Sequence, residues 1–443
     1  MTRRTRKCGA MIPKQVVATL TLSLALAAAS FPKAASGQLP SASTAALGTA
    51  NNYTALARGF SAIALNPAGL AMPGNPGFSL TFLPLQAQVG LNAIALGDVA
   101  AFDGLKIPAT TKEEWLQSVI AEGSLAARGG IALTELALSA GPIGLQVTTV
   151  GEVNVVLGPD AVELALFGNA GRTGPARDMT LTGTSADGWA ATTAAVALGI
   201  PLPVAPGQSL ALGATFKYTV GHIVAAARDN GSLIRANPLG IDLKFPSIAP
   251  DDITPNIRQR NGTGVGLDIG LAWEGSILTV SAAVQNVFNT FQWILDDLAY
   301  YPVDIIFEAD TTATVVDAVP VAGAPATLRD ELLAQSFATA LVLGLAFRPS
   351  DRLALTADFR KQNREALVHG LGGSHVGVGA EIRILSFLPL RGGISRVSGG
   401  GVHFAGGVGL ELGPVHFSGA YLTEKNTADE FRAATFALSF GHN

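Results

Sequence analysis

The sequence predicts an all-β fold, a transmembrane antiparallel β-barrel of about 14 strands, in a range of roughly 12 to 16. Three observations predict it: a secretory signal at the N-terminus, alternating hydrophobic segments that continue to the last residues, and an apolar composition without a helix-length apolar run. The mean hydropathy is +0.37 and only 14% of the residues are charged. A chain that lives in a bilayer without such helices satisfies its backbone hydrogen bonds by closing a barrel. A soluble β-sandwich or propeller also alternates, and is the alternative fold.

Residues 1–37 have the features of a cleaved secretory signal peptide. A positively charged start precedes the apolar stretch Val16 to Ala29, and small residues then offer cleavage after Ser30 or after Gly37. The basic residues of the start are Arg3, Arg4, Arg6, Lys7 and Lys14. We therefore expect the chain to be exported, with residues from 38 onward forming the mature protein.

The composition of the mature chain excludes several classes of function. Six of the 29 Lys and Arg residues lie in residues 1–37, which contain no acid, so 23 basic residues face 33 acidic ones, a net charge of −10. That acidic balance argues against a nucleic-acid partner. Cys8 is the only cysteine, so the mature chain is expected to hold no disulfide, thiolate metal site or cysteine nucleophile.

Residues 38–76 precede the first predicted strand and carry two short motifs. The first is Arg58-Gly59-Phe60 and the second is Asn66-Pro67-Ala68-Gly69. The second motif predicts a turn, because Asn bonds its own backbone, Pro fixes φ and Gly permits a positive φ. We expect this segment to lie inside the barrel as a hatch or plug.

Residues 77–443 alternate with a period of two, which a barrel strand needs because one face contacts lipid and the other faces the lumen. In Leu210 to Gly221 the even positions are apolar, and the odd positions are small or polar, with Lys217 as the one charge. The same pattern recurs in residues 265–273, 353–360, 402–412 and 434–440.

Short polar turns and long insertions separate the alternating segments, which is typical of barrels with tight turns at one end and loops at the other. The predicted turns are Gly141–Gly144, Glu274–Ser276, Arg348–Arg352 and Gly413–Pro414, and the insertions are residues 108–130, 230–260 and 291–331. The first insertion contains a predicted helix over residues 111–127. Its apolar side would consist of Trp115, Leu116, Val119 and Ile120.

The N-terminal motifs resemble those of a known group of barrels. Asn66-Pro67-Ala68 after a signal resembles the signature of the long-chain fatty-acid transporter superfamily, whose hatch ends at this motif. With Ala57-Arg58-Gly59-Phe60 it looks closer to the branch of type IX secretion barrels and uncharacterised outer-membrane proteins. Residues 262–287 and 390–394 are also similar to that branch. The resemblance implies a barrel in the outer membrane of a Gram-negative-type bacterium.

One departure from such barrels concerns the C-terminus. They typically end on an aromatic residue, whereas this chain places Phe440 three residues before its last residue.

The alternating segments assign a set of polar side chains to the lumen. Glu381 and Arg383 stand two residues apart, so both are expected to point inward. Mixed charges would hydrate the lumen or pair across it to hold a plug, and the plain alternative is that they only stabilise the barrel interior. The full set is Lys217, Asp268, Asp358, Arg360, Glu381, Arg383, His403 and Glu411.

The sequence predicts neither an enzyme nor a bound cofactor. Residues 262–266 read Gly-Thr-Gly-Val-Gly, which lacks the G-x-G-x-x-G spacing, so glycines on a lumen face are the preferred interpretation. Ser374 with His375 or His369 is a weak candidate for a lipid hydrolase on the barrel surface. Adjacent strand residues point to opposite faces, which places Ser374 and His375 poorly for joint action.

No metal site is predicted either. His403 and Glu411 share the predicted lumen face and are read as channel polarity. The loop pairs Asp251-Asp252 and Asp296-Asp297 could hold Ca²⁺ or divalent-bridged lipopolysaccharide, but solvated loop acids are the preferred interpretation.

We therefore expect an outer-membrane barrel that passes hydrophobic or amphipathic small molecules, with its wall in contact with membrane lipid. Long loops would supply an apolar surface that captures the molecule, through Phe291, Trp293, Tyr300 and Tyr301. The alternative is a secretion adaptor or structural barrel that binds a protein cargo through the same loops.

Overall fold

The computed structural model describes residues 39–169, 171–237, 239–250, 260–307, 317–334, 337–362, 374–397, 401–425 and 429–442. The predicted signal peptide, His369 and Asp251-Asp252 lie outside the described residues. The helices are α2 (Thr44–Gly48), α3 (Phe60–Leu65), α4 (Leu96–Ala100), α5 (Ala109–Glu122), α6 (Pro159–Phe167) and α7 (Ala326–Ala334), with 3₁₀ turns η1 (Pro67–Ala71), η2 (Leu295–Asp297) and η3 (Val321–Gly323).

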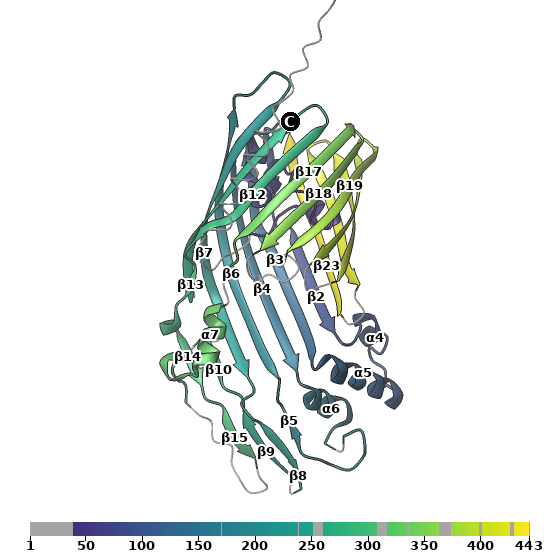
Figure 1. The fold of residues 1–443 in the computed structure, drawn as a ribbon, viewed down its shortest axis with the longest axis vertical. Helices are drawn as coiled ribbons and strands as arrows, with labels where there is room; N and C mark the ends of the chain where they lie inside the picture. Colours follow the sequence, from purple (N-terminus) through teal and green to yellow (C-terminus); the bar gives the residue numbers. More distant parts are fainter. Residues whose placement is uncertain are drawn as a thin grey trace, which may run out of the picture. The chain divides into compact units, whose positions relative to one another are not determined.

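The wall of the barrel is built from antiparallel strands (Figure 1). They are β1 (Phe78–Thr81), β2 (Leu85–Asn92), β3 (Leu125–Ala140), β4 (Ile143–Leu157), β6 (Ser185–Leu202), β7 (Ser209–Arg228), β11 (Gly262–Glu274), β12 (Leu278–Asn289), β17 (Ala340–Ser350), β18 (Leu353–Gln362), β19 (His375–Leu385), β20 (Leu388–Val397), β21 (Val402–Leu412), β22 (Val415–Lys425) and β23 (Asp429–His442).

These strands form a closed sheet over the described residues. From β3 onward each wall strand pairs with the next in this list, β1 and β2 both pair with β3, and the last strand, β23, pairs back with both β1 and β2. Because β1 and β2 are two halves of one strand with the same two neighbours, the wall has 14 strand positions. The predicted antiparallel barrel of about 14 strands is confirmed.

Shorter strands form within the long connections at one end of the barrel. One small sheet joins β5 (Met179–Thr180), β8 (Leu233–Ala236), β9 (Leu239–Lys244) and β15 (Asp304–Phe307). A further group extends the wall beside β7 and β11, and consists of β10 (Ser247–Pro250), β13 (Gln292–Trp293), β14 (Leu298–Tyr301) and β16 (Val319–Pro320).

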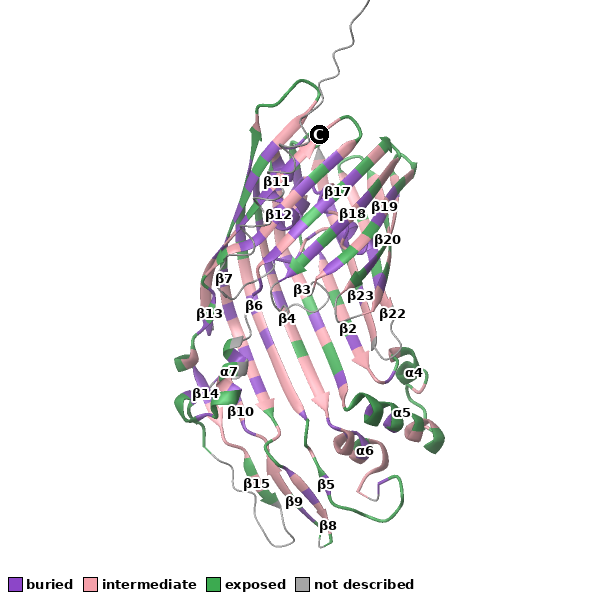
Figure 2. Ribbon diagram, viewed as in Figure 1, coloured by how far each residue is buried: buried purple, intermediate pink, exposed green. Residues whose placement is uncertain are grey.

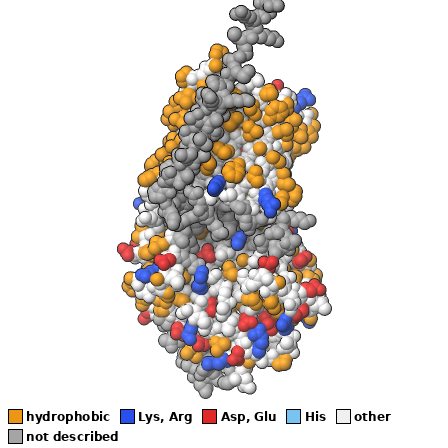
Figure 3. All heavy atoms as spheres, in the orientation of Figure 1, with side chains coloured by type: hydrophobic (Ala, Val, Ile, Leu, Met, Phe, Trp, Pro, Cys, Tyr) orange, Lys and Arg blue, Asp and Glu red, His pale blue; other side chains and the backbone are white. Residues whose placement is uncertain are grey.

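Burial follows the predicted alternation along the wall strands, as the striping in Figure 2 shows. On β7, Phe216 is 52% exposed on the outer side, whereas its neighbour Lys217 is 2% exposed on the inner side. Leucine, valine, isoleucine and phenylalanine dominate the outer side, and Figure 3 shows these hydrophobic side chains gathered around the strands, away from the charged loop end. An apolar outer belt of this kind suits contact with lipid.

Among the described residues, no helix is long and apolar enough to cross a membrane.

Tight turns join the strands at one end of the barrel. Gly141-Pro142 links β3 to β4 and Gly413-Pro414 links β21 to β22, close to the predicted positions. The turn predicted at Arg348–Arg352 is shorter than expected, because β17 continues to Ser350 and only residues 351–352 turn.

Long connections occupy the other end, where one predicted helix needs correction. The helix predicted over residues 111–127 is α5, which ends at Glu122 because Gly123 adopts φ 85° as a left-handed C-terminal cap. Trp115, Leu116 and Val119 are buried, but Ile120 is 44% exposed, so its predicted place on the buried side is wrong. The connection that carries α6 was not predicted.

The connection around α6 is held by one ion cluster. Arg177 pairs with Asp160 and with Glu163, each at 2.7 Å. Burial by itself would raise the pKa of both carboxyls. Hydrogen bonds from Arg177 outweigh it, with further ones from the backbone N–H of Thr180 to Asp160 and of Arg172 to Glu163, and lower both pKa values.

We predict that acid loosens α6 while the barrel strands stay protected. Because both folded pKa values lie below the unfolded ones, the cluster stabilises α6 fully above about pH 4 and loses this contribution as pH falls through the folded values. The hydrogen-exchange protection factors of the α6 amides, corrected for the intrinsic pH dependence of exchange, should therefore fall in acid. Arg177→Gln should exchange faster already near neutral pH; an unchanged acid response in that variant would contradict the assignment.

Candidate functional site in the barrel lumen

Residues 39–76, here called the N-terminal segment, lie against the inner side of the wall. The segment contains α2, α3 and η1, and most of its side chains are buried. Hydrogen bonds tie it to strands around the barrel. Gln146 on β4 donates to Pro40 O at 2.8 Å, Thr215 on β7 donates to Ile63 O at 2.9 Å, and Gln285 on β12 donates to Ala64 O at 2.9 Å. The segment therefore bridges strands that are far apart in the sequence.

The Asn66-Pro67-Ala68-Gly69 motif forms the start of η1. The Asn66 side chain accepts a hydrogen bond from Ala68 N at 3.1 Å and donates one to Leu271 O of β11, also at 3.1 Å. Pro67 occupies the first helical position, where its missing N–H costs nothing. At Gly69, an added Cβ would overlap Ala57 O. One motif thus makes a turn and attaches it to the wall.

The η1 turn packs directly on glycines of the inner side of the wall. A Cβ at Gly213 of β7 would overlap Pro67 and Ala68, and one at Gly270 of β11 would overlap the Asn66 side chain. A Cβ at Gly199 of β6 would stand 2.7 Å from Ala71 N. Lumen-facing glycines therefore bring main chain against main chain, which larger residues would prevent.

Arg58 fixes the tight-turn side of the N-terminal segment. Its guanidinium donates to the carbonyls of Pro73, Ala55 and Ala57 at 2.9–3.2 Å and pairs with Glu274 of β11 at 2.9 Å. Gly59 follows with φ 58°, and Phe60 begins α3. Phe60 is only partly buried and packs against the apolar cluster that contains Ile63 and Leu65.

The opposite side of the segment meets Asp358 of β18. Asp358 Oδ2 accepts hydrogen bonds from Thr54 N at 3.0 Å and from Thr54 Oγ1 at 2.5 Å. Arg360 lies two residues further on the same face, and the strand register sets it opposite His375 of β19. All three wall residues are buried. Asp358 and Arg360 thus lie in the lumen, and Asp358 holds the segment directly.

The remaining predicted lumen charges lie in two groups. Glu381 pairs with Arg391 at 2.8 Å and with Arg383 at 3.2 Å, and Arg383 also pairs with Glu411 at 2.6 Å. His403 instead stands 3.4 Å from Glu424. His403 and Glu411 therefore have different partners, and the described residues contain no cluster of metal-ligand type.

Two cavities lie between the N-terminal segment and the tight-turn end of the wall. The larger has a volume of about 830 Å³ and includes Arg58, Arg391 and Glu411 in its lining. The smaller, of about 540 Å³, is lined by Glu274, Arg348 and Glu381 among others. Tyr53 and Arg383 line both, so charged groups surround this end of the lumen.

Lys217 forms a closed polar network deeper in the wall. Its Nζ stands 2.6 Å from Asp268 Oδ1 and also contacts Asn286 Oδ1. Asn286 N donates to the same Asp268 oxygen at 2.7 Å, and Asn286 adopts φ 55° where the β11–β12 register shifts. The predicted lumen charges Lys217 and Asp268 are therefore partners of each other.

The aromatic residues predicted to form the apolar capture surface are buried or partly buried in the structure. Phe291 is 2% and Trp293 is 4% exposed. They turn inward because Gly221 and Gly262 leave room for their rings on the inner wall, and Gly264 leaves room for the main chain at Phe291. Tyr300 packs against the same cluster and stays partly buried, as does Tyr301, whose hydroxyl donates to Pro250 O at 3.4 Å.

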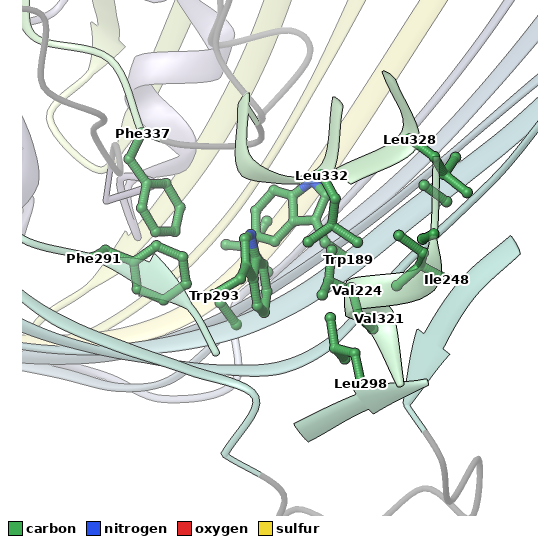
Figure 4. Close-up of a cluster of buried hydrophobic side chains, with 14 residues drawn as sticks. Trp189, Val224, Ile248, Phe291, Trp293, Leu298, Val321, Leu328, Leu332 and Phe337 are labelled. Atoms are coloured by element: carbon green, nitrogen blue, oxygen red, sulfur yellow. The ribbon is translucent and has the colours of Figure 1, made fainter. Parts of the chain in front are cut away.

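Phe291 and Trp293 belong to an apolar cluster at the loop end of the lumen (Figure 4). Phe337 contacts Phe291 and Trp189 of β6, with ring centroids 4.7 Å and 5.9 Å apart. The other members come from β4, β6, β7, β10, β14, η3, the residue after η3, and α7: Val150, Ala191, Val224, Ala226, Ile248, Leu298, Val321, Ala324, Leu328 and Leu332.

Sequence reasoning missed Glu274, Arg391 and Glu424. Glu274 was taken as part of a turn, although it continues the inward parity of Gly270 and Asp268 on β11. Arg391 and Glu424 lie in strands whose alternation was not read. Ser374 accepts a hydrogen bond from Gln362 N at 3.3 Å, while His375 is buried on the lumen side, so the structure does not pair them.

We predict that Gly213→Ala unseats the η1 turn. The new Cβ would overlap the main chain at Pro67 and Ala68, so the N-terminal segment must shift. Leakage of a small sugar from vesicles that contain the barrel should rise. Gly392→Ala is the matched control, because its added Cβ meets nothing closer than 3.9 Å. Equal leakage in both variants would show that the close approach does not seal the lumen.

We predict that Arg58→Gln loosens the N-terminal segment far more than Arg348→Gln. Both arginines pair with Glu274, but the Arg58 side chain is 12% exposed and that of Arg348 is 38% exposed. Losing the buried partner should cost about 3 kcal/mol, against at most about 1 kcal/mol for the exposed one.

Thiol labelling measures this difference, because Cys8 is the only native cysteine and residues 39–443 contain none. A Thr49→Cys reporter, buried in the parent protein, should react on the order of 100-fold faster in Arg58→Gln. Arg348→Gln should leave the rate close to that of the parent, and similar acceleration in both variants would refute the role of Arg58.

Comparisons with known proteins give structural likenesses only. No family model matches the sequence, and no curated protein matches it. Similar solved structures include a Pseudomonas aeruginosa FadL homologue (11% identity, TM-score 0.47, 92% of this chain and 100% of that chain) and the Ralstonia pickettii toluene transporter TbuX (12% identity, TM-score 0.48, 90% and 98%). A third is the CymD monoaromatic hydrocarbon channel, at 13% identity and a TM-score of 0.45, covering 92% and 100%. The assignment of the barrel therefore rests on its own strand register.

Proposed function

We propose that this chain is a gated passage for hydrophobic or amphipathic small molecules across the outer membrane of a Gram-negative-type bacterium. The observation that carries the proposal is the N-terminal segment, which fills the lumen and acts as the hatch. A barrel filled in this way is not a free diffusion pore, so passage requires the segment to shift. No covalent chemistry is part of the proposal.

The way the hatch is held supports a gate. Its η1 turn seats on wall glycines, while Arg58 and Thr54 attach it to Glu274 and Asp358 through a few polar contacts. Cavities remain between the hatch and the tight-turn end. A modest shift of the hatch therefore has space to occur without unfolding the wall.

The apolar cluster at the loop end supports hydrophobic cargo. Phe291, Trp293, Phe337 and Trp189 form a wall of rings where a molecule from outside would enter. Because these rings are buried at rest, entry requires the residues around α7 to move. When a hydrophobic molecule enters, contacts among the cluster side chains are replaced by contacts between these side chains and the bound molecule. The apolar surface therefore stays out of water.

The location is inferred from the sequence and from the outer surface. The signal-like residues 1–37 direct export, and the apolar outer belt calls for lipid around the wall. A secretion adaptor would use the loop aromatics as a surface for a protein cargo. Since Phe291 and Trp293 are buried, no observation favours that second function.

We predict that deleting residues 39–70 opens the barrel. Without the segment, the wall glycines border an empty lumen, and small hydrophilic solutes should pass. Planar-bilayer conductance should rise from near zero to stable ion-conducting levels, while circular dichroism retains the strand signal.

Replacing the exposed α4 residues by a Gly-Ser stretch of equal length serves as the control, because α4 has no buried residue. Conductance of the control should match that of the parent. Unchanged conductance in a correctly folded deletion variant would count against the hatch and against the gated passage.

A further inference from the structure

A chain of hydrogen bonds joins four neighbouring strands of the wall, β3, β4, β6 and β7 (Figure 1). Thr149 of β4 donates to Glu135 Oε1 of β3 at 2.5 Å, and its Oγ1 lies 2.7 Å from Thr192 Oγ1 of β6. Thr192 Oγ1 lies in turn 2.8 Å from Nε2 of His222 on β7. A carboxylate and an imidazole are thus connected through two hydroxyl groups. We call Glu135, Thr149, Thr192 and His222 the outer polar chain.

The alternation of the strands sets the outer polar chain on the side of the wall that faces lipid. Gln146 of β4 is buried and donates to the N-terminal segment, so Thr149, at the opposite parity, points outward together with its register partner Thr192. Leu145 is 40% and Val153 is 52% exposed on the same face of β4. Each lies about 13 Å along the strand from Thr149, on either side of it. The outer polar chain therefore lies within the apolar belt.

Both ends of the outer polar chain are extra residues in their strands. The β3–β4 register skips Glu135, and the β6–β7 register skips His222. A β-bulge of this kind re-aims a side chain and is common beside functional sites. Two separate bulges thus bring the two ionisable groups to the same pair of hydroxyls.

Ionisable side chains on a lipid-facing surface are costly, and within a membrane they indicate a functional site. The hydrogen bond between Thr149 and Thr192 already links β4 to β6 without a charged group. Linking strands therefore does not account for Glu135 and His222.

The direction of the hydrogen bonds follows from the protons that each group can give. A threonine hydroxyl has one proton, and a carboxylate accepts only. Thr149 gives its proton to Glu135, so Thr192 must donate to Thr149, and His222 Nε2 must donate to Thr192. His222 Nε2 therefore does not act as a base toward Thr192. All donors of the outer polar chain point toward Glu135.

Glu135 keeps an acceptor to spare. Its Oε2 accepts no hydrogen bond from the described residues, and a carboxylate oxygen without a donor is costly in apolar surroundings. The Glu135 side chain is partly exposed, so a donor in the bilayer can approach the carboxylate. A molecule that completes this site must therefore bring a proton donor.

Apolar residues beside Glu135 suit the body of such a molecule. The first strand is broken at residues 82–84, between β1 and β2, and the register with β3 sets this break opposite Glu135. Phe82 is 43% and Leu83 is 55% exposed there. A hydrogen-bond acceptor and an exposed apolar surface thus lie at the same level of the wall.

We propose that the outer polar chain is a lipid-side binding site for an uncharged amphipathic molecule that carries a hydroxyl group, an alcohol or a phenol. The hydroxyl donates to Glu135, and the apolar part lies along Phe82 and Leu83. Charged lipid head groups do not fit, because exposed apolar side chains flank the site on both sides. The site lies outside the lumen and does not depend on the proposed passage.

The direct test compares diazirine-labelled octanol with the matching octyl methyl ether, on the parent protein in lipid nanodiscs. The ether replaces the hydroxyl proton by a methyl group and cannot donate. After photolysis, mass spectrometry should find octanol attached at residues 82–84 and around Glu135 at least about fivefold more often than the ether. Equal labelling of these residues by both probes would overturn the proposal, as would octanol labelling confined to the N-terminal segment and the lumen side.

A pair of variants tests the role of Glu135. Glu135→Gln keeps an oxygen for Thr149 but replaces the spare acceptor by an amide donor, so the preference for octanol over the ether should disappear. Tyr218→Phe is the matched control, because it removes a hydroxyl from a side chain 42% exposed on the outer face of β7. The control should keep the parent ratio of labelling. If Glu135→Gln also keeps that ratio, Glu135 is not the acceptor and the proposal fails.

Discussion

Closure of the wall by backbone hydrogen bonds is the constraint on which the rest of the structure depends. Once β23 pairs with β1 and β2, the described part of the wall has no open edge, and each wall residue faces either outward or inward. The outer side collects large apolar groups, while the inner side collects glycines, short hydroxyl residues and charges. The contacts in the lumen form between this inner side and the N-terminal segment that lies against it.

Two kinds of contact hold the N-terminal segment in place. Toward β4, β6 and β7 the N-terminal segment packs Ile63 and Leu70 against Ala195 and Ala197, with main chain resting on glycine. Toward β18, Asp358 accepts hydrogen bonds from Thr54, while toward β19 and β20 the main chain at Thr49 again rests on Gly379 and Gly393. Hydrogen bonds also reach the segment from β4 and β7, through Gln146 and Thr215. Close packing on glycine and directed hydrogen bonds therefore hold the segment on both sides.

Much of the fold could be predicted from the sequence because a period of two is a local property. The strand segments, the tight turns and the inward parity of Lys217 and Asp358 follow from neighbours in the chain. Partners such as Arg391 for Glu381 depend on register between strands, which no local pattern fixes. The burial of Phe291 and Trp293 was also not predicted. Aromatic residues in a long insertion give the same sequence pattern whether they face solvent or pack inside the lumen. Gly221 and Gly262, which face these rings on the inner wall, were the signal that the rings could fold inward.

The split first strand has a consequence for how the molecule assembles. β1 and β2 pair with β23, so this seam unites residues from opposite ends of the described chain, and such non-local pairings form slowly. The N-terminal segment leads directly into β1 and touches strands from β4 to β22. It must therefore be inside before the seam completes, or thread through an end afterwards. If the first wall strands bind the N-terminal segment early, the remaining strands would assemble around it.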